Sequence, residues 1–200
     1  MRVTPALLVL VACASSKPAP TPPSSPVGRS IVFFGNRVGS SVTTEGSDGL
    51  ITNVVDIHDN GRGPHADATF RLAADGTIRE LDVTGHSELN APVDEHFSVK
   101  NGHAEWHSLE ERGEKHLEGP AFFLPNSAAD AHGYLLAALQ KNGGVMPLLP
   151  GGTARLEKAG DISLPLGHLT LYAITGLGFL PTFVWTRDDG SYFAEVEPGF

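Results

Sequence analysis

The sequence predicts a mainly β fold of the α+β class: a curved antiparallel sheet of roughly nine strands with one helix packed on it. Three observations support this prediction. Short apolar segments of about 8–12 residues are separated by tight-turn signals. Two of the resulting hairpins sort cleanly into an apolar and a polar face. One stretch, residues 127–141, has helical periodicity.

The turn signals are Asx-Gly pairs, in which both residues tolerate the positive φ that tight hairpin turns need. They occur at Asp48-Gly49, Asn60-Gly61, Asp75-Gly76, Asn101-Gly102 and Asp189-Gly190. Residues 59–70 (DNGRGPHADATF) are therefore predicted to form a hairpin loop. The alternative is a ligand contact, because Arg62 lies between two glycines whose backbone N–H groups could help it hold an anion.

A two-residue loop at Asn101-Gly102 places Phe97 opposite Trp106 on the core face and His96 opposite His107 on the solvent face. Val99 pairs with Ala104 and Glu95 with Ser108 on the core face, and Ser98 pairs with Glu105 on the solvent face.

A second hairpin, at Asp75-Gly76, follows the same rule. Phe70 faces Leu81 and Ala68 faces Val83 on the apolar side, and Arg71 faces Glu80 on the other side as an opposite-charge pair.

The remaining strands are predicted from their β-branched and aromatic content, over residues 31–34, 50–57, 153–159, 168–174, 180–186 and 191–196. The helix, residues 127–141, has Ser127 as its N-cap, Asp130 in its first turn and Gly143 after its end. Its apolar stripe consists of Ala131, Tyr134, Leu135, Ala138 and Leu139.

The first residues are typical of an export signal. Arg2 precedes the short apolar core of residues 6–12, and Cys13 follows within a stretch that resembles a bacterial lipobox. We expect residues 1–13 to be a lipoprotein-type signal peptide with Cys13 as the lipidated residue. Residues 14–28 would be a Pro/Ser-rich tether and residues 29–200 a single β-rich domain. The expected location is the periplasm, with a lipid anchor in the outer membrane; ordinary signal-peptide cleavage is the alternative.

The charge balance argues against a nucleic-acid partner, because 14 basic against 23 acidic residues give a net charge of −9. The chain has one cysteine and therefore no internal disulfide. It has no apolar run of about 18 residues, so membrane contact is expected through the lipid anchor only.

Candidate metal ligands are His96 and His107, which lie opposite each other, and Glu105 on the same face. The alternative is a polar patch that faces solvent. The sequence has no His-x-His, no His-Glu-x-x-His and no Gly-x-Ser-x-Gly. No catalytic residue is therefore predicted, and the chain is expected to be inactive alone.

Four aromatic residues, Phe122, Phe123, Phe183 and Trp185, could line an apolar cleft between the sheet and the helix, or could belong to the core.

Several motifs follow one another in a familiar order: residues 60–64 (NGRGP), 72–76 (LAADG), 93–97 (VDEHF), 149–158 (LPGGTARLEK), 172–177 (YAITGL) and 189–194 (DGSYFA). Together they resemble the N-terminal region of exported bacterial metal-dependent amidohydrolases of the imidazolonepropionase-like kind. The resemblance implies hydrolysis of C–N bonds by a following (β/α)₈ catalytic domain, which would hold a divalent metal such as zinc. This chain would then be its non-catalytic N-terminal domain. The alternative is a free-standing periplasmic lipoprotein that binds a ligand or a protein partner in a cleft between sheet and helix.

Overall fold

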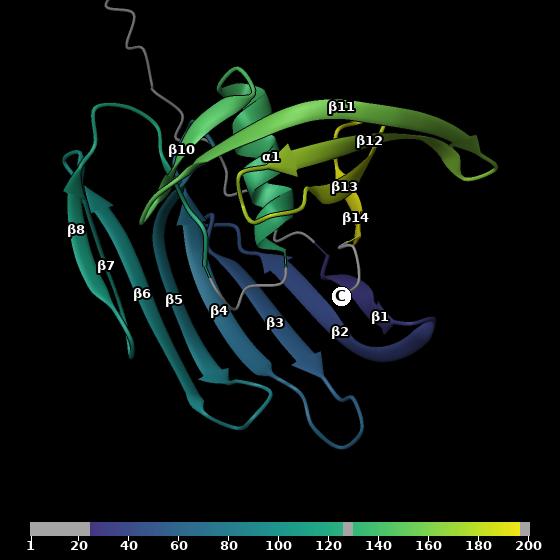
Figure 1. Ribbon diagram of the computed structural model, residues 1–200, viewed down its shortest axis with the longest axis horizontal. Coiled ribbons are helices and arrows are strands. Elements are labelled where there is room, and N and C mark those ends of the chain that lie inside the picture. The colour runs from purple at the N-terminus through teal and green to yellow at the C-terminus, as the bar shows by residue number, and fades with distance from the viewer. Residues whose placement is uncertain (1–24, 126–129, 197–200) are drawn as a thin grey trace, which may run out of the picture.

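In the part of the chain that the structure describes, the fold consists of two β-sheets with one helix between them (Figure 1). The computed structural model describes residues 25–125 and 130–196. The export signal, Cys13 and most of the predicted tether lie outside these residues. The mainly β class is confirmed, and the strands are divided between a sheet of eight and a sheet of six.

The eight-stranded sheet is a simple meander, in which each strand pairs antiparallel with the next. Short turns allow this topology, because antiparallel neighbours need only a hairpin between them. Its strands are β1 (Val27–Phe33), β2 (Asn36–Glu45), β3 (Ile51–Ile57), β4 (His65–Leu72), β5 (Ile78–His86), β6 (Pro92–Lys100), β7 (His103–Ser108) and β8 (Arg112–His116).

The six-stranded sheet has the order β14-β13-β12-β11-β10-β9. All its neighbours are antiparallel except β9 and β10, which run parallel. Its strands are β9 (Phe122–Phe123), β10 (Val145–Leu149), β11 (Thr153–Leu164), β12 (Gly167–Thr175), β13 (Thr182–Arg187) and β14 (Tyr192–Val196).

The helix, α1 (Ala131–Lys141), contacts both sheets. Tyr134 meets the ring of Phe70 on β4 edge-to-face at 4.9 Å between centroids. On its other side the helix packs against β11, β13 and β14. Its buried residues are Ala131, Leu135, Leu136, Ala138 and Leu139, so most of the predicted stripe is confirmed and Leu136 joins it. The helix begins at Ala131 with Asp130 as its N-cap, so the prediction that Ser127 caps it and that Asp130 lies in its first turn is wrong. Ser127 itself lies outside the described residues.

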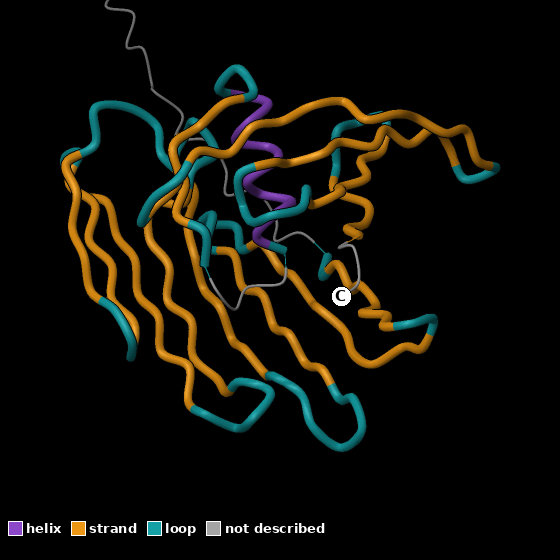
Figure 2. Tube along the Cα trace, viewed as in Figure 1, coloured by secondary structure: helices purple, strands orange, loops and turns teal. Residues whose placement is uncertain are grey.

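The Asx-Gly pairs all lie at turns between consecutive strands, as predicted (Figure 2). In the loop between β3 and β4, Asn60 and Gly61 have φ values of 50° and 77°. Asp59 and Arg62 exchange backbone hydrogen bonds across this turn. The stretch 59–70 is therefore a hairpin turn followed by a strand. The guanidinium of Arg62 makes no hydrogen bond, ion pair or ring contact with any residue that the structure describes, and its role as a ligand contact stays a prediction.

The register of the β6–β7 hairpin agrees with the sequence prediction, with Phe97 opposite Trp106 and His96 opposite His107. Phe97 is fully buried and stacks on Phe123 at 4.4 Å between ring centroids. All three pairings predicted for the Asp75-Gly76 hairpin are also present, including Arg71 opposite Glu80. Turn chemistry and side-chain alternation were thus enough to fix which face of these strands is buried.

Candidate functional site

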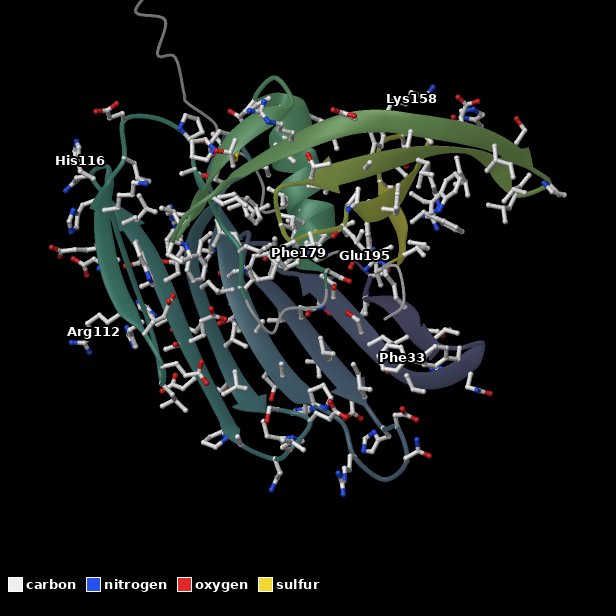
Figure 3. All side chains as sticks on the ribbon, in the orientation of Figure 1. Phe33, Arg112, His116, Lys158, Phe179 and Glu195 are labelled. Atoms are coloured by element: carbon white, nitrogen blue, oxygen red, sulfur yellow. The ribbon has the colours of Figure 1, made fainter. Side chains whose placement is uncertain are left out.

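A cleft of about 1210 Å³ opens between the two sheets. One wall is the edge strand β1 with the neighbouring faces of β3 and β4, and the opposite wall is β14 with the first residues of α1. Figure 3 labels Phe33 and Glu195, which belong to these two walls. The lining mixes apolar side chains with a small set of charged ones, which is the usual composition of a binding site.

The first charged group, here called the Asp130 cluster, comprises Arg29, Ser41, Thr43, Asn53 and Asp130. The Asp130 carboxylate accepts a hydrogen bond from the Arg29 guanidinium at 2.7 Å and another from the Thr43 hydroxyl. Asn53 Nδ2 donates to the Ser41 and Thr43 hydroxyls at 2.8 and 2.9 Å. The cluster thereby ties β1, β2 and β3 to the start of the helix.

The position of Asp130 explains why a carboxylate is stable in this nearly dry place. Asp130 is the N-cap of α1, where the helix dipole favours negative charge. Its side chain makes no capping hydrogen bond to the helix and is directed to the cluster instead. The ion pair with Arg29 offsets the cost of burying the carboxylate, whose side chain is 7% exposed.

Arg29 also connects the cluster to the opposite wall. Its guanidinium lies 4.5 Å from the centre of the Tyr192 ring, a cation–π contact between β1 and β14. The same ring also meets the helix at Gly133, where a β-carbon would lie 2.9 Å from two ring atoms. Gly133 therefore allows the helix to approach β14 closely.

A second charged pair lies beside the tyrosine. His132 Nδ1 is 2.9 Å from Glu195 Oε1, and both side chains are less than one-fifth exposed. The other carboxylate oxygen, Glu195 Oε2, is buried and has no hydrogen-bond partner among the described residues. Glu195 lines the cleft and its side chain is 17% exposed, so a rotation of the carboxylate would present this acceptor to a ligand with an N–H or ammonium group.

The two tyrosines beside these groups resist ionisation. Burial, followed by the nearby Asp130 carboxylate, raises the pKa of Tyr134 to about 12. Burial also raises the pKa of Tyr192 well above its ordinary value, and the carboxylates of Glu195 and Asp130 act in the same direction. Both phenols therefore remain neutral at physiological pH and serve as apolar surfaces with a polar tip.

The predicted metal ligands lie on the outer face of the eight-stranded sheet, away from the cleft. The rings of His96 and His107 are 5.1 Å apart, and His96 Nδ1 pairs with Asp82 at 2.6 Å. Glu105 instead lies near His103 and Glu114, and the ligand atoms of these three residues are within 4.8 Å of one another. The metal hypothesis for His96, His107 and Glu105 stays a prediction.

Of the two alternatives for the four aromatic residues, the structure supports a place outside the cleft. Phe122 and Phe123 are buried core residues. Phe183 and Trp185 alternate on β13 with Val184, which is fully buried, and thus lie on the opposite face of the strand. None of the four lines the cleft that the structure contains.

In comparisons with known proteins, no family model, no curated protein and no solved structure matches the chain. The relation to amidohydrolases therefore stays a prediction from sequence motifs. Among the described residues no helix is long and apolar enough to cross a membrane.

Proposed function

We propose that this chain is a binding module that holds a ligand or a protein partner in the cleft between its two sheets. The observation that carries the proposal is the cleft itself, which combines apolar walls, a buried ion-pair cluster and an unpartnered carboxylate oxygen. A few polar groups among apolar side chains give a binding site its orientation and specificity.

The charged groups of the cleft suit binding better than catalysis. Asp130 is engaged by Arg29 and Thr43, and His132 is engaged by Glu195. A general base needs a free position from which to reach a substrate proton. Side chains that hold one another in place instead form a rigid wall, which supports recognition.

The amidohydrolase resemblance extends this proposal to a specific partner, a (β/α)₈ catalytic domain that would supply its own divalent metal. The export signal adds a location: a lipid anchor at Cys13 would hold the module at the periplasmic side of the outer membrane. The variant Cys13→Ala tests the anchor, because it should release the protein from the membrane fraction and abolish incorporation of labelled palmitate.

Binding in the cleft is tested with the neutral dye N-phenyl-1-naphthylamine, whose fluorescence rises in apolar surroundings. Ile31→Trp fills part of the cleft, and Val54→Trp places the same bulk on the exposed face of β3 as a control. We expect Ile31→Trp to weaken dye binding at least tenfold and Val54→Trp to leave it unchanged. Absence of dye binding in the unmodified protein, or equal effects of the two variants, would contradict the proposal.

A further inference from the structure

The two facing edge strands suggest what kind of partner the cleft receives. All seven residues of β1 line it, and so do all five residues of β14. Successive side chains of a strand point to opposite faces of its sheet, so either face alone presents only every second residue. A cleft wall to which every residue of the strand contributes is therefore the backbone edge of that strand. The cleft is therefore bordered by the hydrogen-bonding groups of two strands.

Both edges are unpaired within the described part of the chain. β1 pairs only with β2, and β14 pairs only with β13. Five consecutive pairs from Val27 to Ile31 form a regular ladder before a bulge interrupts β1. A regular edge of this length is a ready template for one more strand.

Edge strands are normally protected from such pairing by charged side chains, especially lysine, or by proline. β8, at the other edge of the same sheet, follows this rule: it is short, polar and exposed, with the sequence RGEKH. β1, with the sequence VGRSIVF, has neither lysine nor proline, and its one charged residue, Arg29, is held by Asp130. Val27, Val32 and Phe33 are each about half exposed. The sheet is thus protected at one edge and left open at the edge that faces the cleft.

The dimensions also favour a peptide segment. At about 1210 Å³ the cleft exceeds the roughly 300–1,000 Å³ of small-molecule pockets. The seven residues of β1 extend over about 23 Å at the usual rise per strand residue. An extended chain can occupy a slot of this length, whereas a compact small molecule leaves most of the edge unpaired.

The charges indicate what the segment carries. Both guanidinium groups of the cleft are engaged by the protein: Arg29 with Asp130, and Arg187 over the ring of Phe193 at 4.8 Å. Glu195 Oε2 has no partner among the described residues, and the chain as a whole carries a net charge of −9. A basic side chain complements this wall.

We propose that the cleft receives an extended peptide segment that adds as a strand to β1, with apolar side chains toward the sheets and one lysine or arginine at Glu195. This inference rests on the binding module proposed above and specifies its partner. The added strand would use main-chain hydrogen bonds for affinity and the Glu195 contact for specificity.

The probe is a fluorescein-labelled peptide of alternating valine and threonine with one central lysine. One control peptide carries glutamate in place of the lysine. A second control peptide carries N-methyl groups on alternate amides, so that one of its two backbone edges has no hydrogen-bond donors. We expect the N-methylated and glutamate peptides to bind at least tenfold more weakly than the parent peptide, measured by fluorescence anisotropy. Glu195→Gln should weaken the parent peptide and reduce its advantage over the glutamate peptide, whereas Glu157→Gln, exposed on β11, should change neither.

Each other outcome overturns the inference. Equal binding of the parent and N-methylated peptides would show that the cleft holds a peptide without strand pairing. No binding of the parent peptide up to about 1 mM would exclude a peptide partner of this kind. A dimer of the protein that excludes the peptide would assign the edge to a second copy. The dye experiment reports on the cleft independently, so failure of the peptide to bind a protein that binds the dye contradicts the strand and leaves the binding module in place.

Discussion

At the scale of single residues, Asp130 is the centre of the site because it joins the helix to three strands through side-chain hydrogen bonds. Asp130→Ala leaves the Arg29 guanidinium without its carboxylate. Because Arg29 is partly exposed, we expect a loss of about 2–4 kcal/mol in the free energy of unfolding, somewhat below the value for a fully buried pair. This loss in the free energy of unfolding is measured by chemical denaturation. In a protein that already carries Arg29→Met, Asp130→Ala should lower the free energy of unfolding clearly less, because the ion pair is already broken. Equal losses with and without Arg29→Met would contradict a stabilising ion pair between Arg29 and Asp130.

The buried tyrosine Tyr134 makes a prediction about pH. Its pKa is raised by burial from 10.0 to about 12, so the unfolded chain loses this proton at a lower pH than the folded protein does. The contribution of the neutral Tyr134 phenol to the free energy of unfolding is therefore complete below pH 10 and is lost as the pH rises toward 12. Over this range the free energy of unfolding falls by up to about 1.4 kcal/mol per pH unit.

Tyr134→Phe is the matched variant for this effect, because it keeps the ring that contacts Phe70 and removes the titrating group. We expect the free energy of unfolding of this variant to fall less steeply above pH 10 than that of the unmodified protein. Identical slopes would show that the Tyr134 phenol titrates normally.

The residues of the site were harder to predict than the fold. Arg29 is 101 positions from Asp130 in the sequence, and Asn53 is 77 positions away. Serine, threonine and asparagine on a strand are also ordinary surface residues. No local spacing marks such a cluster, because it forms only where β1, β2 and β3 meet the helix. For the same reason, Glu195 and His132 were not predicted as residues of the site.

At the scale of elements, the close packing of α1 against β14 depends on Gly133. Alanine normally favours a helix over glycine by about 1 kcal/mol, but its β-carbon would lie 2.9 Å from the Tyr192 ring. We expect Gly133→Ala to lower the free energy of unfolding by about 1–2 kcal/mol, because the clash outweighs the gain in helix propensity. In a Tyr192→Ala background the same substitution should become neutral or stabilising. If Gly133→Ala alone made the protein more stable than the unmodified protein, the close packing of α1 against β14 would be contradicted.

Hairpins were the elements that the sequence predicted best. Asn101-Gly102 sets the turn, and the alternation of Phe97 and Val99 with polar neighbours sets the face, so the local information was complete. β8 is not evident from its sequence because its five residues are polar on both faces and it forms only by pairing with β7. The turn at Phe34, with φ of 49°, is also hidden, since phenylalanine is not a usual turn residue.

At the scale of the whole molecule, the two sheets close around the helix but leave β1 and β14 facing each other across an open cleft. The sequence predicted the β class and the packed helix, but it did not predict the division into two sheets. That division follows from the long strands β11 and β12, which pair with each other rather than with the meander. The candidate function therefore depends on tertiary arrangement, since the two edges belong to opposite ends of the described chain.

The most direct test of the open edge is amide hydrogen exchange along β1 in the free protein. Alternate amides of an edge strand bond to its one neighbour, and the amides between them point to solvent. We predict an alternating pattern over Val27–Ile31, in which the amides bonded to β2 are protected and those between them exchange at rates near those of an unstructured peptide. Uniform protection along this stretch would show that the edge is already covered and would contradict the open cleft.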